Sequence, residues 1–270
     1  MFDFITDESF DIEKTKQYSL SIQVSLDGFS FLAFDPTENR IVALKNTPLK
    51  ISSENLLVRR LKEWLETEVM FSKPFNNVRL YFFTEHFVLV PEEFAAENNG
   101  EKLNSALFQT DLSSQSIENK IEKINARLIF QLPPYLSEVL HPFFNNNFEI
   151  IHPVTKLLES QPESNKRNCA VIITTKKYFL MTVTRNNKLL LANSFPIVHQ
   201  NDLVYNVLNA FQQLGTARNE TQLFVADALN QNSEVEELLK PYFQNINNLK
   251  TPEFIANPEI ANHSLQLYLH

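Results

Sequence analysis

The sequence predicts an α/β protein with mixed central sheets, built from two halves that follow the same order of strands and helices. In each half, three strand-like segments joined by tight turns precede an amphipathic helix and a further apolar strand. The chain has 270 residues, 43% of them hydrophobic and 21% charged, which suits two domains of ordinary size with sizeable cores. The alternative is two unrelated meanders, each followed by a helix.

Turn residues divide the first half into short segments. Leu20, Ile22 and Val24 alternate with polar residues, and the pair Asp27 and Gly28 that follows favours a tight hairpin turn. The predicted elements are strands over 18–25, 29–34 and 41–44, a helix that begins after an N-cap at Ser52 or Ser53, and strands over 77–83 and 87–90.

The second half repeats the pattern of the first with different residues. Its predicted elements are strands over 169–175, 178–184 and 188–192, a helix capped by Asn201 or Asp202 and ended by Gly215, a strand over 222–226 and a helix over 233–239. The region between the halves is predicted to hold helices over 117–124 and 135–140, a strand over 127–131, and turns at His141–Pro142 and His152–Pro153. The polar segment 161–168 lacks an apolar anchor, so we place a boundary there between domains 1–160 and 161–270.

Composition argues against several kinds of partner and location. Asp and Glu outnumber Lys and Arg by 32 to 24, and the net charge of −8 repels nucleic acids and anionic membranes on average. No run of about 18 apolar residues predicts a membrane span. The first residues, Met1–Phe4, are acidic, unlike a signal peptide, and the single cysteine, Cys169, excludes an internal disulfide. We therefore expect a cytoplasmic protein that binds no nucleic acid.

No motif indicates a known chemistry. The chain has no P-loop, no dinucleotide fingerprint, no G-x-S-x-G elbow and no H-E-x-x-H or Cys/His cluster. A nuclease that uses Mg²⁺ would need several converging carboxylates, whereas the first strand carries Ser21 and Gln23 instead. Cys169 opens an apolar strand, as a buried cysteine does, although a Cys–His nucleophile remains an alternative. We expect no catalytic residues, no metal site and no cofactor.

Several segments resemble a known family. They are Tyr18–Ile22, Leu80–Phe83, Phe87–Pro91, Ala126–Phe130 with Pro133 and Pro134, His152 with Pro153, and Leu191–Phe195. Together they resemble an uncharacterised family of Bacteroidota proteins assigned to the actin-like ATPase fold and to no known activity. The resemblance covers nearly the whole chain. It implies two tandem ribonuclease H-like domains with a cleft between them.

Members of the actin-like superfamily that bind ATP hold its phosphates on a glycine-rich hairpin turn from each domain. Backbone N–H groups can point at a phosphate only where no Cβ intervenes. In this chain the first turn, Leu26–Phe29, keeps Asp27 and Gly28, but the second turn, Thr174–Tyr178, has no glycine. Because the whole chain has only 3 glycines, we expect the conventional ATP site to be absent.

Asp27, Gly28 and Lys176 are nevertheless the candidate residues of the predicted cleft. Asp27 fits a remnant of a phosphate or metal site, but an Asp–Gly pair is also an ordinary hairpin turn, which we favour. Lys176 and Lys177 fit an anion site, but a solvated turn explains them more simply.

The absence of recognisable chemistry favours a non-catalytic function. We expect a degenerate actin-like protein that acts as a binding or scaffold module for another protein. Core packing explains most of its 23 phenylalanines, and the alternative is that an exposed subset forms a protein-binding face. The alternative is a nucleotide-binding switch or ATPase with an unusual phosphate site in the inter-domain cleft. The sequence indicates no oligomeric state.

Overall fold

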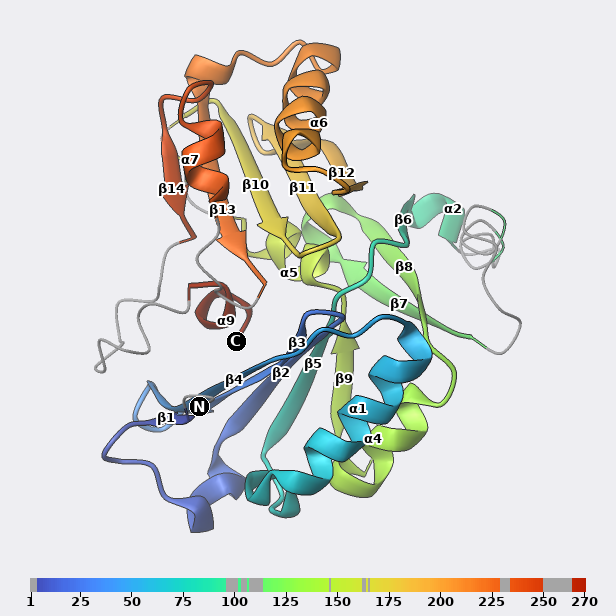
Figure 1. The fold of residues 1–270 in the computed structure, drawn as a ribbon, viewed down its shortest axis with the longest axis vertical. Coiled ribbons are helices and arrows are strands. Elements are labelled where there is room, and N and C mark those ends of the chain that lie inside the picture. The colour runs from blue at the N-terminus through green and yellow to red at the C-terminus, as the bar shows by residue number, and fades with distance from the viewer. Residues whose placement is uncertain are drawn as a thin grey trace.

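The computed structural model describes residues 4–95, 102, 106, 114–145, 147–161, 164, 166–228, 234–249 and 264–270. These residues form a six-stranded sheet, a five-stranded sheet and a three-stranded sheet, called here the first, second and third sheets (Figure 1). The polar segment 97–100, whose composition indicates a loop, and part of the boundary segment 161–168 lie outside the described residues.

The first sheet is mixed and belongs to the N-terminal part of the chain. Its strands are β1 (Phe4–Thr6), β2 (Ser19–Ser25), β3 (Gly28–Asp35), β4 (Arg40–Pro48), β5 (Asn77–Phe82) and β9 (Phe148–Ile151). Their order is β1-β4-β3-β2-β5-β9. β2 runs antiparallel to β3 but parallel to β5, and β5 runs parallel to β9.

The second sheet repeats this arrangement. Its strands are β10 (Asn168–Thr174), β11 (Tyr178–Arg185), β12 (Lys188–Pro196), β13 (Thr221–Asp227) and β14 (Ile246–Asn248), in the order β12-β11-β10-β13-β14. β10 runs antiparallel to β11 but parallel to β13, and β13 runs parallel to β14. The five strands of this sheet therefore follow the order of β4-β3-β2-β5-β9. The predicted α/β class with mixed central sheets is confirmed.

The third sheet corrects one prediction. It consists of β6 (Phe87–Pro91), β7 (Gln115–Ile121) and β8 (Ala126–Leu132), in the order β6-β8-β7. The helix predicted over 117–124 is wrong, because this segment is β7 followed by a 3-10 turn, η3 (Glu122–Ile124). Ile117 and Ile121 are four residues apart, a spacing that fits a helix face and also a strand face. Antiparallel pairing with β8 and the buried side chain of Asn119 decide for the strand.

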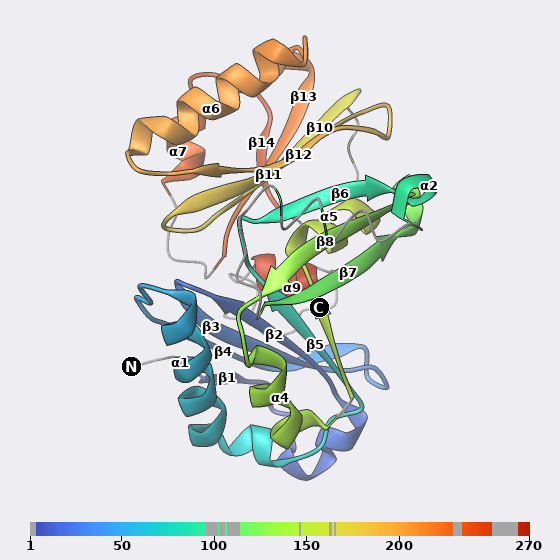
Figure 2. The same cartoon turned by 90° about the vertical axis from the view of Figure 1, so that its right-hand side faces the viewer.

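Helices cover the sheets. The described helices are η1 (Ile12–Gln17), α1 (Glu54–Thr67), η2 (Val69–Ser72), α2 (Glu92–Ala95), α4 (Leu136–Phe144), α5 (Pro153–Glu159), α6 (Gln200–Gln213), η4 (Arg218–Glu220), α7 (Val235–Leu239) and α9 (Ser264–Leu269). α1 begins at the predicted N-cap Ser53, whose side chain accepts a hydrogen bond from the Leu56 amide. α1 also packs beside α4 on one face of the first sheet (Figure 2). None of the helices in the described ranges is long and apolar enough to cross a bilayer.

α6 differs from its prediction at one end. Its N-cap is His199 and not Asn201 or Asp202. Asp202 lies in the first turn instead, where its carboxylate accepts hydrogen bonds from the amides of Val198 and His199. A carboxylate satisfies such free amides from inside the first turn as well as from the cap.

Two further predictions concern the glycine that ends α6 and a turn that falls within α4. Gly215 ends α6 as predicted, with a φ of 57°. The turn predicted at His141–Pro142 is wrong, because both residues lie within α4. The proline is tolerated because the carbonyl that it leaves without a donor belongs to the exposed Glu138.

The two halves share one hydrophobic core. A single cluster of buried side chains joins residues of the first sheet, such as Ile22 and Leu80, to residues of the second sheet, such as Leu180 and Phe224. Figures 1 and 2 both place α9 between the two sheets, where it contacts β2, β3 and β13. A second, separate core lies between the second sheet and α6 with α7.

Candidate functional site

The structure brings two hairpin turns face to face at the junction of the halves. The β2–β3 turn carries Asp27, and the β10–β11 turn carries Lys176. The Asp27 carboxylate accepts a hydrogen bond of 2.8 Å from the backbone amide of Lys176. Two of the three residues that the sequence singled out therefore meet, and Gly28 follows Asp27 directly at the start of β3.

Asp27 lies in a nearly closed environment, with 7% of its surface exposed. Burial raises the pKa of its carboxyl above the ordinary value, and the charge of Asp227 adds to this. The Lys176 amide and the charges of Lys176 and Lys177 act in the opposite direction. The Asp27 carboxyl is thus a desolvated group whose hydrogen-bond donor comes from the other half of the chain.

Gly28 is required by the packing of its own hairpin. A Cβ at this position would lie 2.3 Å from the Thr47 carbonyl oxygen and 2.7 Å from the Leu49 nitrogen. The φ of Gly28 is +134°, which other residues rarely adopt. The Leu49 amide also donates to the Asp27 carbonyl. The end of β4 therefore occupies the space beside Gly28, so the packing of its own hairpin explains this glycine.

The backbone amides of the second turn all donate hydrogen bonds within the chain. The Thr175 amide donates to the Tyr178 carbonyl at 2.8 Å, and the Lys176 amide donates to Asp27. The amides of Lys177 and Tyr178 both donate to the Thr175 hydroxyl, at 3.3 and 3.1 Å. Each amide from 175 to 178 thus has an acceptor within the chain.

Further contacts tie the halves together around these turns. The Lys177 ammonium donates to the Ser52 carbonyl at 3.4 Å, and the Ser194 hydroxyl donates to the Glu85 carbonyl at 2.6 Å. The Tyr178 side chain is buried, and burial raises the pKa of its phenol. The junction is therefore a packed interface at the hairpin turns.

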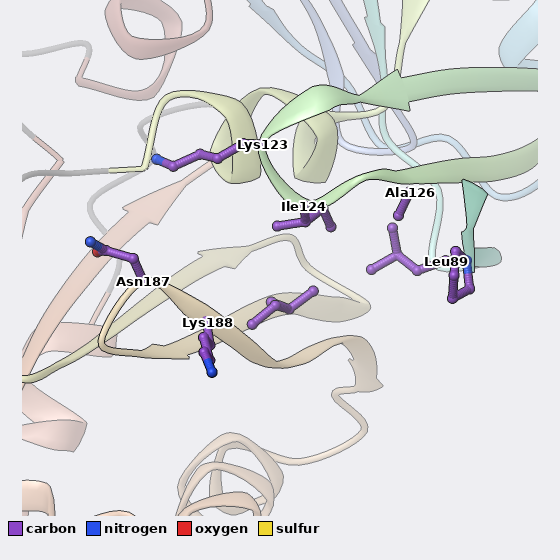
Figure 3. Close-up of a pocket in the computed structure, with 8 residues that line it drawn as sticks. Leu89, Lys123, Ile124, Ala126, Asn187 and Lys188 are labelled. Carbon is purple, nitrogen blue, oxygen red and sulfur yellow. The ribbon is translucent and has the colours of Figure 1, made fainter. Parts of the chain in front are cut away.

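A groove opens further along the same junction, between the third sheet and β12 (Figure 3). We call it the β6–β12 groove. Its cavity has a volume of about 410 Å³ and is lined by Leu89, Pro91, Lys123, Ile124, Ala126, Asn187, Lys188 and Leu189. Sequence analysis missed this groove because its residues come from separate segments that only the fold brings together.

A second, polar cavity of about 290 Å³ lies between β5, β7, β9 and α5. Arg79 and Lys156 line it together with Glu149 and Glu159. Burial lowers the pKa of Lys156, and the nearby Arg79 charge lowers it further. The Lys156 ammonium donates to the His270 carbonyl at 3.3 Å.

Cys169 is a buried free thiol, and His152 is a buried helix cap. Burial raises the pKa of the Cys169 thiol to about 11, which keeps it protonated at neutral pH. His152 is fully buried and caps α5, with Nδ1 accepting from the Val154 amide and Nε2–H donating to the Thr84 carbonyl. Within the described ranges, no three His, Cys, Asp or Glu side chains lie close enough to hold a metal ion.

Comparison with known proteins places the sequence in a family. A family model described as a protein of unknown function, DUF3822, matches residues 7–246. The chain belongs to the DUF3822 family. No curated protein matches the sequence.

Comparison of structures shows the fold of this DUF3822 chain. A protein of unknown function with an actin-like ATPase fold from Bacteroides thetaiotaomicron superposes with a TM-score of 0.78 and 23% identity, covering 96% of this chain and 98% of that one. A chain of the PilM-PilN type IV pilus biogenesis complex superposes with a TM-score of 0.56 and 11% identity, covering 93% and 97%. The chain therefore has the actin-like ATPase fold.

Proposed function

We propose that this DUF3822 protein is a non-catalytic, degenerate member of the actin-like fold that works by binding another protein. The observation that carries the proposal is the use of the amides at the second hairpin turn. A phosphate site needs several backbone N–H groups without acceptors of their own. Here the amides of 175–178 are satisfied within the chain, and the Asp27 carboxylate stands where an anion would have to bind.

Several observations support a protein as the partner. The relative of similar fold in the PilM-PilN complex takes part in a protein assembly. The net charge of −8 disfavours nucleic acid. The β6–β12 groove leaves apolar side chains partly uncovered at the junction of the halves.

We also propose how the chain is organised and where it works. The shared strand order of the two sheets supports two ribonuclease H-like domains, over 1–160 and 161–270, that arose by duplication. Cys169 is a buried free thiol, which supports a cytoplasmic location. The relative from Bacteroides thetaiotaomicron supports an origin in the Bacteroidota.

The alternative is a nucleotide-binding switch that uses Asp27, Gly28 and Lys176. The meeting of the two turns favours it, because actin-like ATPases hold phosphate between such turns. It requires the bond between Asp27 and Lys176 to open, so that the Lys176 amide can face a phosphate. The buried Asp27 carboxylate would then have to lie beside phosphate oxygens or a bound Mg²⁺.

Thermal unfolding with and without Mg-ATP, Mg-GTP and Mg-ADP distinguishes the two functions. We expect no shift in Tm with any of them. A ligand at one hundred times its Kd stabilises a fold by roughly 2.7 kcal/mol, which raises Tm by a few degrees. A shift of that size, absent from Asp27→Ala and kept in the surface control Glu66→Ala, would show nucleotide binding at the turn and overturn the proposal.

A further inference from the structure

We propose that the β6–β12 groove binds an extended segment of a partner protein in which acidic residues flank large apolar ones. The inference rests on the proposed function and names the chemistry of its partner. Three properties of the groove support it: its apolar walls, its two lysines without a carboxylate partner among the described residues, and the edge strands that bound it.

The walls of the groove come from both halves of the chain. Leu89 and Ala126 belong to the inner face of the third sheet, and Ile124 belongs to η3 beside them. Leu189 belongs to β12, which lies across the groove from the third sheet. Leu89, Ile124 and Leu189 are only half-buried, so a bound apolar side chain would remove further apolar surface from water.

The size of the groove limits its occupant. A cavity of about 410 Å³ lies near the lower end of the range for ligand-binding pockets. It suits a few inserted side chains rather than the whole face of a helix. An extended segment presents side chains to one face at every second residue, which fits a narrow groove of this kind.

The charges of the groove differ from those of the molecule. Lys123 lies on one side of it and Lys188 on the other, and both side chains are exposed (Figure 3). Within the described part of the chain, neither lysine has a carboxylate within ion-pair distance. The neighbouring Lys120 and Arg127, by contrast, are both paired with glutamates. In a chain of net charge −8, two exposed lysines beside an apolar wall are complementary to an acidic segment.

Within the described ranges, the strands that bound the groove lie at the edges of their sheets. β12 ends the strand order of the second sheet, and β6 ends that of the third. Among the described strands, β12 pairs only with β11, and β6 pairs only with β8. A strand at a sheet edge offers backbone donors and acceptors to an added strand, which favours an extended occupant.

Peptide selection on the full-length chain tests the proposal. A random peptide library is selected on the wild-type protein with a Lys123→Glu/Lys188→Glu variant as the counter-selection. Both lysines are exposed, so the variant should fold, and an unchanged Tm checks this. We expect the enriched peptides to carry Asp or Glu next to Leu, Ile, Phe or Trp.

Binding of one enriched peptide, labelled with fluorescein, is then measured by fluorescence polarisation. The double variant should bind it roughly tenfold or more weakly, and added salt should weaken wild-type binding. The control Lys16→Glu/Lys62→Glu makes the same change of charge at exposed lysines on η1 and α1, and it should bind like wild type.

The outcomes separate this inference from the proposed function. Peptides that bind wild type and the double variant equally, or that lack acidic residues, would overturn the proposal for the β6–β12 groove. They would leave the proposed function, protein binding, intact. Failure to enrich any peptide would also overturn the proposal that the groove binds such a segment. Enrichment failing together with a Tm shift by nucleotide would overturn the proposed function as well.

Discussion

At the scale of single residues, the same side chains that suggested a nucleotide site serve the fold. Asp27 bonds to the Lys176 amide across the junction. Gly28 makes room for the end of β4. A sequence shows that an Asp–Gly pair makes a hairpin turn, but it cannot show what lies against that turn. Whether a glycine admits a ligand or a neighbouring strand is decided by contacts between distant segments.

His152 makes the stability of the fold depend on pH. It is fully buried, and burial lowers its pKa from an ordinary 6.5 to about 4. Its Nδ1 accepts from the Val154 amide, so protonation would turn two donors toward each other. The unfolded chain takes up this proton near pH 6.5, and the folded chain takes it up only near 4. The contribution of His152 to stability is therefore present above about pH 6.5 and declines by roughly 3 kcal/mol as the pH falls to about 4.

Urea unfolding of wild type and His152→Gln between pH 4 and pH 7.5 measures this effect. The variant should be less stable at neutral pH because it loses packing and hydrogen bonds. Its free energy of unfolding should nevertheless fall less than that of wild type between 6.5 and 4. His141→Gln, a change at an exposed histidine, should keep the wild-type dependence of the unfolding free energy on pH. If the unfolding free energies of wild type and His152→Gln changed equally with pH, His152 would not be the source of the pH dependence.

At the scale of elements, sequence patterns predicted most of the strands and the longest helices, α1, α4 and α6. Alternation and turn residues located β2, β3, β10 and β11, because these hairpins are local. The pattern over 117–124 failed because apolar residues four apart suit both a helix and a strand, and pairing with β8 is not local information. The β6–β12 groove could not be predicted for the same reason. Leu89, Ile124 and Leu189 come together only when the two halves pack.

The first turn of α6 shows how local chemistry stabilises an element. The Asp202 carboxylate accepts from the amides of Val198 and His199, at 2.9 and 2.8 Å. The hydrogen bonds donated by these amides lower the pKa of Asp202. Asp202→Ala should reduce the free energy of unfolding at neutral pH, because both amides lose their acceptor. Asn201→Ala, one residue away on the exposed side, is the matched control.

Chemical denaturation at neutral pH measures both α6 variants. Asp202→Ala should shift the midpoint to lower urea without changing the slope, whereas Asn201→Ala should move it little. Equal midpoints for the two variants would show that the carboxylate bonds do not stabilise α6.

At the scale of the whole molecule, the two halves are coupled by a common core. One cluster of buried residues includes Leu80 from the first sheet and Leu180 from the second, together with Leu265 of α9. A hinged pair of domains would instead be expected to have a smaller and more polar interface. The packed junction and the bonded hairpin turns agree with a protein whose halves hold a fixed groove rather than close around a nucleotide.

This coupling predicts that both halves unfold together. The chain has one tryptophan, Trp64, which packs against Phe29 and Phe71 in the first half and reports on that half alone. Met181 is fully buried in the separate core under α6, in the second half. Met181→Ala should cost 2 to 5 kcal/mol, a range that roughly covers large-to-small core changes. If the halves are coupled, the Trp64 fluorescence transition must move to lower urea although the substitution lies in the other half.

Fluorescence and far-UV circular dichroism of the same samples decide the question. Coincident transitions that both shift in Met181→Ala indicate one cooperative unit. Leu80→Ala, in the shared core of the first half, should shift both signals in the same way. If Met181→Ala left the Trp64 midpoint unchanged while circular dichroism gained an earlier step, the halves would unfold independently. A groove between independently unfolding halves would lose its fixed shape, so this result would also weaken the case for a preformed β6–β12 groove.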